Sequence, residues 1–244
     1  MSRRRALVFA AGRGERMRPL TDHTPKPLLE TGGKRLIEWH LERLAAAGID
    51  EVVINTAHLA EQFPAALGDG ARWNLRIHYS HEGAQALETG GGMLQALSHF
   101  GDDAFIVVNG DVWSDVDFAR LPAHPVGVAH LVLVDNPPQH ARGDFALAAD
   151  GRVSVEGEAK LTYSGIGIYH PALLADWQRD LAAQGHAWDG STPPKFALVH
   201  LLRAAMTRGA VSGEHYRGRW TDVGTPQRLA ELDASLRTAS RDQA

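Results

Sequence analysis

The sequence predicts an α/β fold built on a predominantly parallel, mixed sheet with helices on both faces. Short apolar or β-branched runs alternate with helical patterns through the first half of the chain, beginning with ALVFAA (6–11) and LIEWHLERLAAAG (36–48). Such alternation is typical of a parallel sheet that is covered on both sides. The length of 244 residues and the hydrophobic content of 44 % favour one domain with a sizeable core.

The runs that follow support this order. In the segment 36–48, apolar residues recur at helical spacing before the stop signal of Gly48; these residues are Leu36, Ile37, Leu41 and Leu44. The strand runs EVVINTA and LRIHYS each precede a helical pattern, and the strand run AFIVVNGD ends in an acidic turn. Ligands of such folds bind beyond the carboxyl ends of the strands. In this chain, the residues suited to bind a ligand follow the strand runs.

The pattern changes at about residue 126. Four strand runs follow, VGVAHLVLVD, DFALAAD, RVSVEG and AKLTYSGIGIYH, with a hairpin turn at Asp150-Gly151. We expect neighbouring strands of a β-rich extension that covers a pocket. Helices are expected over 172–185, 195–208 and 226–238. The whole chain, 1–244, is expected to be one domain, with halves of about 1–125 and 126–225 and a C-terminal helix and tail, 226–244.

Composition and charge exclude several classes of protein. The net charge of −4 does not support bulk binding of nucleic acid or of an anionic membrane, and the absence of cysteine excludes disulfides and thiolate sites. The apolar run in the basic start MSRRRALVFAAG is too short for a signal peptide, and no run approaches the roughly 20 residues of a membrane span. We expect a cytoplasmic protein, and no pattern in the chain predicts its oligomeric state.

A basic, proline-rich loop, AAGRGERMRPLTDHTPKPLL (10–29), follows the first strand run. Gly12 and Gly14 let the backbone turn sharply and present N–H groups to an anion. The loop holds four cations, Arg13, Arg16, Arg18 and Lys26, and its prolines stiffen it. Because guanidinium and ammonium groups pair well with phosphate oxygens, the loop suits a nucleoside triphosphate. The alternative is a solvated basic loop.

The loop differs from two common phosphate loops. A P-loop ends in Gly-Lys-Ser/Thr, which this stretch lacks. A dinucleotide-binding loop needs a third glycine, and Met17 stands in its place. The stretch therefore indicates another kind of phosphate-binding loop.

The motif Gly-x-Gly-x-Arg-x-x-Pro-Leu-Thr, followed by Pro-Lys-Pro-Leu, resembles the signature loop of the sugar nucleotidyltransferases. The resemblance extends through LETGGG and VNGDV to WTDVGT, nearly the whole chain, and GERMRPLT, HLVLVDNP and SGEHYRG are most similar to the branch that acts on N-acetylmuramate 1-phosphate. It implies a Rossmann-like, GT-A-like nucleotidyltransferase fold with a sugar-binding β-rich extension. It also implies Mg²⁺-dependent transfer of UMP from UTP to the sugar 1-phosphate, with release of pyrophosphate, in peptidoglycan recycling.

The resemblance also assigns roles to individual residues. Arg16 is expected at the β- and γ-phosphates and Lys26 at the α-phosphate, and these two residues and Asp111 are expected to be catalytic. The nucleotide-binding residues that it implies are Ala11, Gly12, Gly14, Glu15, Arg16, Lys26, Thr89, Gly90 and Asn109.

Two aspartates are candidate metal ligands. Asp111 follows the strand run AFIVVNG and is well placed to hold Mg²⁺ against triphosphate oxygens, the alternative being a helix cap. The resemblance implies Asp222, in RWTDVGT, as the second ligand. Because Asp222 lies 111 residues after Asp111 (222 − 111), only the fold can bring the two together.

The segment EGAQALETGGG (82–92) is the candidate reader of the base. Backbone groups of Thr89 and Gly90 suit uracil, whose N3–H donor lies between two carbonyl acceptors. The alternative for the three glycines is close helix packing. Glu82 is expected either to accept a base N–H or to be a solvated loop acid.

Sugar contacts are expected in three places. Asn109, in the same turn as Asp111, suits a ribose or sugar hydroxyl, and the resemblance implies contacts at Gly143, Asp144 and Glu158. The chain carries EGEAKL where many relatives carry Glu-Lys-Pro. Candidate cations for the lactyl carboxylate of N-acetylmuramate are Arg142, His215 and Arg217, the alternative being that all three are solvated surface groups.

Two alternatives to this reaction stay open. The base could be guanine or thymine and the sugar mannose or glucose, and Glu82 is an acid of the kind that guanine's N–H edge calls for. A nucleotide-sensing domain without catalysis would show the loss of Lys26, Asp111 or Asp222, and the chain retains all three.

Overall fold

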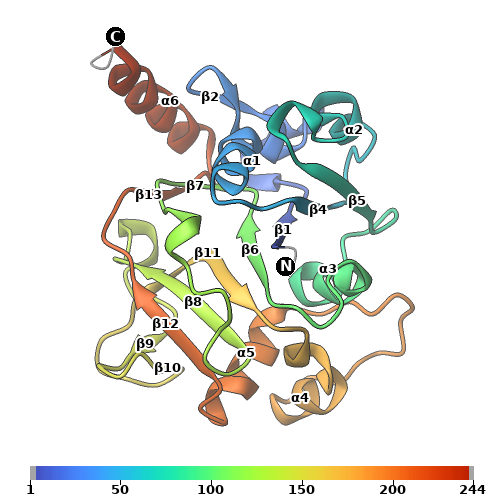
Figure 1. The fold of residues 1–244 in the computed structure, drawn as a ribbon, viewed down its shortest axis with the longest axis vertical. Helices are drawn as coiled ribbons and strands as arrows, with labels where there is room; N and C mark the ends of the chain where they lie inside the picture. The colour runs from blue at the N-terminus through green and yellow to red at the C-terminus, as the bar shows by residue number, and fades with distance from the viewer. Residues whose placement is uncertain (1–3, 242–244) are drawn as a thin grey trace.

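The protein folds around a seven-stranded sheet with the order β12-β8-β11-β6-β1-β4-β5 (Figure 1). The computed structural model describes residues 4–241. The strands of the sheet are β1 Arg5–Phe9, β4 Glu51–Thr56, β5 Arg76–His81, β6 Phe105–Asn109, β8 Ala129–Val134, β11 Thr162–Tyr169 and β12 Val211–His215. Within it only β11 runs antiparallel to its neighbours, so the predicted mixed, predominantly parallel sheet is confirmed.

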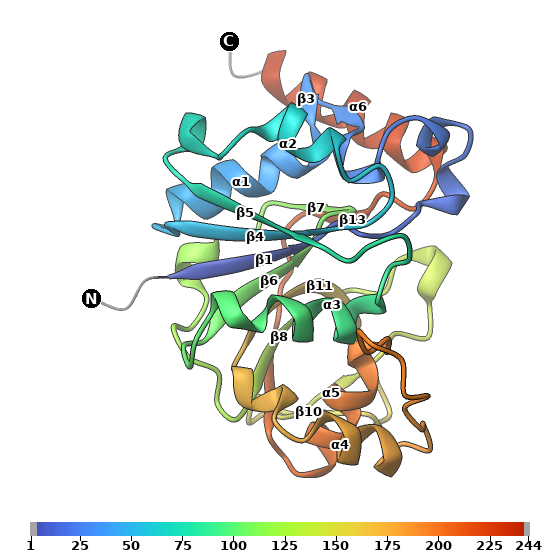
Figure 2. The same cartoon turned by 90° about the vertical axis from the view of Figure 1, so that its right-hand side faces the viewer.

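Helices cover both faces of the sheet, as predicted. The α-helices of the described residues are α1 Leu36–Ala46, α2 Gln62–Leu67, α3 Glu88–Ala96, α4 Trp177–Ala183, α5 Leu198–Thr207 and α6 Pro226–Arg241. Figure 2 shows α1 and α2 on one face and α3, α4 and α5 on the other. None of the helices within residues 4–241 combines the length and the apolar character needed to cross a membrane.

The first apolar run of the sequence forms strand β1, which is buried on both faces and therefore shows no alternation of apolar and polar residues. Ala6 and Val8 belong to the hydrophobic cluster on the α1 face, whereas Leu7 belongs to the cluster on the α3 face. Because successive side chains of a strand point to opposite faces, a strand covered on both sides has to be apolar throughout. In α1, the four apolar residues predicted to form one face are all fully buried; they are Leu36, Ile37, Leu41 and Leu44.

The second half of the chain departs from the predicted row of neighbouring strands. Strands β8 and β11 join the main sheet, but β9 (Ala146–Leu147) and β10 (Val153–Ser154) form a separate two-stranded hairpin. This hairpin contacts α5 and β12, and no residue of it lines the main cavity. Strands of two residues offer little edge for pairing, which is why DFALAAD and RVSVEG do not extend the sheet.

Helix α6 anchors two parts of the chain that lie far apart in the sequence. Its Leu232 and Leu236 pack with Met17, Trp113 and Val223 in a third hydrophobic cluster. It also covers the hairpin formed by β2 (Glu30–Thr31) and β3 (Lys34–Arg35). The helix predicted over 226–238 continues to Arg241; the end of the predicted tail, 242–244, and residues 1–3 of the first half lie outside the described residues.

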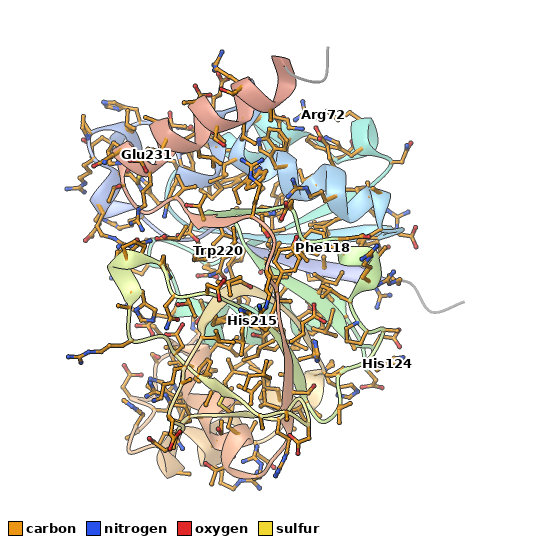
Figure 3. All side chains as sticks on the ribbon, turned by 90° about the vertical axis from the view of Figure 1, so that its left-hand side faces the viewer. Arg72, Phe118, His124, His215, Trp220 and Glu231 are labelled. Carbon is orange, nitrogen blue, oxygen red and sulfur yellow. The ribbon has the colours of Figure 1, made fainter. Side chains whose placement is uncertain are left out.

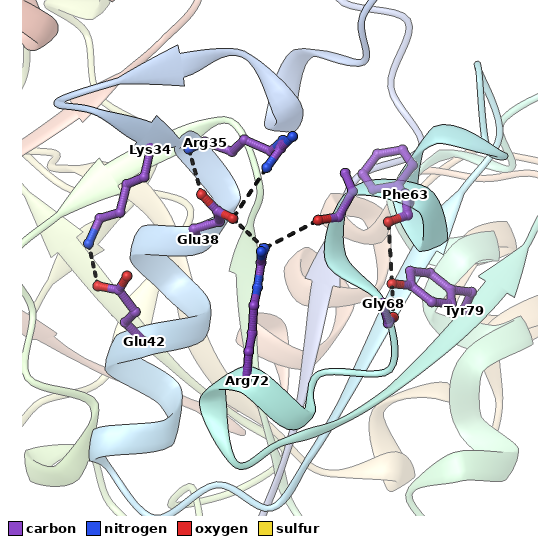
Figure 4. A network of polar contacts seen from close by, with 9 residues as sticks. Lys34, Arg35, Glu38, Glu42, Phe63, Gly68, Arg72 and Tyr79 are labelled. Atoms are coloured by element: carbon purple, nitrogen blue, oxygen red, sulfur yellow. Dashed lines mark hydrogen bonds and ion pairs between the residues drawn. The ribbon is translucent and has the colours of Figure 1, made fainter.

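A polar network fixes α1 against the connection between α2 and β5 (Figure 4). Glu38, which is buried, accepts the Arg35 N–H at 2.8 Å and pairs with the guanidinium of Arg72. Tyr79 donates to the carbonyl oxygen of Gly68 at 2.6 Å. The buried carboxylate is thus fully paired, as burial of a charge requires.

We expect the ion pair between α4 and α5 to contribute measurably to stability. Asp180 is almost fully buried, and its two oxygens lie 2.9 and 2.8 Å from the guanidinium nitrogens of Arg208. Arg208→Ala should lower the free energy of unfolding by roughly 2 kcal/mol, less than for a fully buried pair because Arg208 is partly exposed. Urea denaturation measures this loss. The matched change Arg152→Ala breaks an exposed pair with Asp150 and should cost much less, because solvent screens it; equal losses would contradict the expectation.

Candidate active site

The parallel register places the ends of three strands side by side. Phe9 of β1 is paired with Asn55 of β4 on one side and with Asn109 of β6 on the other. A cavity of about 580 Å³ opens at this edge and is lined by these three residues, the loop 10–17, Lys26 and the start of α3. It lies beyond the carboxyl ends of the strands, where the sequence predicts the site.

The loop after β1 presents unpaired donors to this cavity. Gly14 has φ +65°, and a β-carbon there would lie 2.9 Å from Thr21 Cγ2, so glycine is needed at this position. Within the described residues, no backbone N–H of residues 11–16 donates a hydrogen bond, and neither Arg13 nor Arg16 forms an ion pair. Free N–H groups and free guanidinium groups facing one cavity form an anion site.

Lys26 and Asp111 meet at the centre of the cavity wall. Lys26 begins the short helix Lys26–Leu28 and is 6 % exposed, and its Nζ lies 2.6 Å from Asp111 Oδ2. The Asp111 side chain is 42 % exposed, so its second oxygen is open to a ligand. Asp111 leaves β6 without capping any helix, which removes the alternative considered from the sequence.

A two-stranded ladder brings Asp222 to the same place. Strands β7 (Val112–Ser114) and β13 (Trp220–Asp222) pair antiparallel, with Asp222 opposite Val112. The Val223 N–H donates to the carbonyl oxygen of Asp111 at 2.9 Å. The fold therefore closes the 111-residue gap between the two aspartates, as their proposed joint role requires.

Asp222 is held from two sides. Its Oδ1 lies 2.5 Å from the Arg228 guanidinium of α6, and accepts from the side-chain amide of Gln139 at 2.7 Å. Gly224, two residues further on, lines the cavity. In the described part of the chain, no group of three or more acidic, histidine or cysteine side chains forms a metal cage. Two carboxylates next to a phosphate-binding loop are nevertheless the donor set that Mg²⁺ takes together with phosphate oxygens and water.

Asn55 and Glu82 form a buried strut under the cavity. Asn55 Oδ1 accepts the Ala10 N–H, and its amide donates to Glu82 Oε1, both at 2.6 Å. Glu82 Oε2 accepts the Leu87 N–H at 2.6 Å. Burial raises the pKa of Glu82, and these hydrogen bonds act in the opposite direction. The strut fixes the ends of β1, β4 and β5 relative to the loop before α3.

The glycines at the start of α3 serve close packing. The Gly90 N–H donates to the Phe196 carbonyl oxygen at 2.9 Å, and a β-carbon at Gly92 would lie 2.3 Å from Glu82 Oε1. Thr89 lines the cavity, and its hydroxyl accepts the Leu198 N–H at 3.0 Å. Of the two groups predicted to read a base, Thr89 therefore faces the cavity, while the N–H of Gly90 is occupied.

Asn109 has its side chain free for a ligand. It lines the cavity and makes no side-chain hydrogen bond within residues 4–241. The register of β11 shifts between Tyr163 and Ile166, beside Asn109. Trp220 donates to the Ser164 carbonyl oxygen at 2.9 Å and holds this bulge, and Figure 3 shows Trp220 between α6 and the end of β12.

Of the predicted sugar-binding residues, only Asn109 lines this cavity; Gly143, Asp144 and Glu158 lie outside it. Asp144 accepts the Tyr163 N–H at 2.8 Å and lies 2.9 Å from His140, while Glu158 is exposed. Gly143 follows the turn Pro138–His140, and Gln139 of this turn donates to Asp222. The loop therefore reaches the side of the site on which Asp222 lies. Among the candidate cations for a lactyl group, Arg142 and Arg217 are exposed and His215 pairs with Asp135 at 2.9 Å.

A family model described as nucleotidyl transferase matches residues 5–145, more than half of the 244 residues. The chain belongs to the nucleotidyl transferase family. The matched segment contains the phosphate loop, the strut and Asp111. As a nucleotidyltransferase the chain is expected to bring two phosphorylated substrates together, and the cavity provides cations for them.

Similar proteins cover the chain almost end to end. The N-acetylmuramate alpha-1-phosphate uridylyltransferase of Neisseria meningitidis serogroup B is 47 % identical, over 94 % of this chain and 97 % of that protein. The protein of the same name from Caulobacter vibrioides is 36 % identical, over 96 % of each. The solved structure of a candidate glucose-1-phosphate thymidylyltransferase from Bacillus anthracis superposes with a TM-score of 0.79 at 19 % identity, covering 96 % of this chain and 95 % of that one. This likeness confirms the predicted nucleotidyltransferase fold.

The structure adds residues that the sequence analysis does not single out. Asn55 stands at the end of a buried strand run, as Asn109 does, and that position was a usable signal. Arg228 carries no such signal, because it reaches Asp222 from the following helix. His40 is a buried residue of α1, and its Nε2 lies 2.8 Å from the Val112 carbonyl oxygen.

We expect His40 to make stability depend on pH. Burial lowers its pKa from 6.5 to about 4. As the pH falls from 6.5 towards 4, the unfolded chain binds a proton that the folded protein excludes, so stability should drop by up to roughly 3 kcal/mol. Urea denaturation at intervals from pH 4 to 7.5 measures the drop. His40→Gln should flatten this slope, and an unchanged slope would show that His40 is not its source.

Proposed function

We propose that the protein transfers UMP from UTP to N-acetylmuramate 1-phosphate, yielding UDP-N-acetylmuramate and pyrophosphate in the cytoplasmic recycling of peptidoglycan. The observation that supports this most strongly is the cavity. Free N–H groups of the loop, the guanidinium groups of Arg13 and Arg16, and Lys26 line it together with Asp111, and a backbone hydrogen bond from Val223 holds the neighbouring Asp222 next to Asp111. The 47 % identity to a protein named for this activity supports the choice of substrates. The same residues argue against a sensing domain without catalysis.

Positioning and charge stabilisation account for the chemistry. An oxygen of the acceptor phosphate attacks the α-phosphorus of UTP, the bond from that phosphorus to the bridging oxygen breaks, and pyrophosphate leaves with the electron pair. The acceptor phosphate has its second pKa near 6 and is ionised at pH 7, so no general base is needed. Arg16 and the loop N–H groups hold the β- and γ-phosphates, and Lys26 stabilises charge at the α-phosphate.

Asp111 and Asp222 would hold Mg²⁺, with remaining ligands from phosphate oxygens and water. When bound, the ion supplies charge neutralisation at the reacting phosphates. Arg228 and Gln139 keep the Asp222 carboxylate in one orientation before substrates arrive. Lys26 exchanges its partner Asp111 for a phosphate oxygen, because both groups lie at the cavity wall.

The strut removes Glu82 as a candidate reader of guanine. Guanine offers N1–H and N2–H₂ donors, which call for a free carboxylate. Both oxygens of Glu82 already accept hydrogen bonds from Asn55 and Leu87, so Glu82 serves the protein. Thr89 remains as a small polar group beside the base, and we propose that Ala11, Gly12, Gly14, Glu15 and the backbone near Gly90 complete the nucleotide site.

We assign the acceptor to the opposite side of the cavity. Residues up to about 125 then bind the nucleotide and residues 126–225 the sugar. Asn109 has a free side chain for a sugar hydroxyl, and the loop with Gly143 and Asp144 reaches Asp222 through Gln139. Glu158 and a cation such as Arg142 would contact the sugar if this loop closes over it.

The proposed reaction is tested by incubating the protein with Mg²⁺ and each triphosphate against a panel of sugar 1-phosphates, and measuring pyrophosphate. We expect UTP with N-acetylmuramate 1-phosphate to give the highest kcat/KM. A charge-assisted contact to the lactyl carboxylate is worth about 1.5–3 kcal/mol, or about 10- to 150-fold over N-acetylglucosamine 1-phosphate. Equal values for the two sugars would refute the acceptor, and a preference for GTP would refute the base.

Asp111→Asn should leave the fold intact and lower kcat at least about 10²-fold, because charge stabilisation at the phosphoryl centre is lost. Mn²⁺ binding measured by electron paramagnetic resonance, in the presence of UTP, should weaken in parallel. Asp102→Asn removes the same charge from an exposed loop and is the matched control. Normal turnover in the Asp111 variant, or full activity in EDTA, would disprove the metal role.

A further inference from the structure

Glu88 has an unusual backbone conformation for its residue type. It begins α3 with φ +61°, in the left-handed region, where a β-carbon is unfavourable. In the described residues only Leu59 and Asn74 share a positive φ among the non-glycine residues. Asparagine tolerates this region, whereas glutamate gains nothing from it. A glycine at position 88 would adopt the same conformation without strain.

The Glu88 side chain faces the main cavity. Glu88 lines it, its side chain is exposed, and its carboxylate forms no hydrogen bond or ion pair within residues 4–241. Burial lowers the pKa of His200 on α5, and the charge of Glu88 acts in the opposite direction. Since Glu82 and Asn55 are consumed by the strut, Glu88 is the carboxylate with free acceptors at this end of the cavity.

The helix dipole does not account for this arrangement. An acidic residue in the first turn of α3 is favourable, but position 89 lies in the same turn and has no positive φ. Glu88 combines a strained backbone with a free carboxylate at the wall of the cavity, and this combination points to a role in binding a ligand.

The charges around the cavity determine which part of a nucleotide Glu88 can meet. Arg13, Arg16 and Lys26 gather the triphosphate at the end of β1, and a carboxylate repels phosphate. Glu88 therefore meets the uncharged nucleoside. In uracil, the N3–H lies between two carbonyl oxygens that repel a carboxylate. The ribose offers two adjacent hydroxyl donors, and carboxylates accept such hydroxyls in dinucleotide-binding folds.

We propose that Glu88 binds the ribose 2′- and 3′-hydroxyls of the nucleotide and makes the enzyme select ribonucleotides over 2′-deoxyribonucleotides. This inference rests on the proposed function, because it takes UTP as the substrate. A thymidine nucleotide lacks the 2′-hydroxyl, so Glu88 also disfavours the thymidylyl alternative.

The test compares UTP with dUTP in pyrophosphate release. In the wild-type protein, kcat/KM for UTP should exceed that for dUTP about 10- to 100-fold, the range of a charge-assisted hydrogen bond. Glu88→Gly should bring the UTP value down to that of dUTP, leave dUTP within about 3-fold, and raise the melting temperature as strain is released. Glu88→Ala should lose the selectivity without the gain in melting temperature. Leu59→Gly relieves strain at a position outside the cavity and should leave the selectivity unchanged.

The outcomes separate this inference from the proposed function. If the wild type releases no pyrophosphate from UTP with any sugar 1-phosphate, the proposed function fails. If it does so but Glu88→Gly lowers UTP and dUTP equally, the ribose assignment is wrong and the carboxylate meets the base or the protein. Unchanged kinetics with a higher melting temperature would reduce Glu88 to a strained residue without a ligand.

Discussion

The parallel ladder that β1 forms with β4 and β6 is the constraint on which the site depends. It sets Asn55 and Asn109 at the level of Phe9, one on each side, so that two amides flank the start of the phosphate loop. The amide of Asn55 forms hydrogen bonds within the protein. It contacts Ala10 and Glu82, and Glu82 in turn holds the loop before α3. The amide of Asn109 stays free at the cavity. A slip of one residue that brought Ile54 or Val108 to the level of Phe9 would replace a polar end by an apolar one.

Charge balance is a second property of the site. Each of the two aspartates already has a cation, Lys26 for Asp111 and Arg228 for Asp222. Neither aspartate is therefore an uncompensated charge, and neither needs a metal to keep it in place. In the proposed reaction, substrate binding would be an exchange of partners: Lys26 would pair with phosphate, and the aspartates would be left to hold Mg²⁺. Such an exchange favours ligands that bring both charges together.

The local sequence pattern predicts most of the fold and the part of the candidate site that lies at the strand ends. The alternation of apolar runs predicted the parallel sheet, and the polar residues after those runs marked the phosphate loop, Asn109 and Asp111, because strand ends of a parallel sheet meet at one edge. Contacts between distant segments left no such mark. The β7–β13 ladder, Gln139 on Asp222 and the packing of Gly92 on Glu82 depend on tertiary approach, which spacing along the chain does not encode. For the same reason, the strands predicted for DFALAAD and RVSVEG were longer than β9 and β10 are in the structure.

Helix α6 imposes an order on the biosynthesis of the enzyme. The ribosome delivers the cation loop and the Asp111 turn early, and chains fold from the N-terminus as they emerge. Asp222 and the leucines of α6, which cover Met17 and Trp113, emerge later. A nascent chain can thus assemble β1, β4 and β6 while still lacking the second carboxylate. Because Arg228 of α6 holds Asp222, the proposed metal site would be complete only after α6 docks.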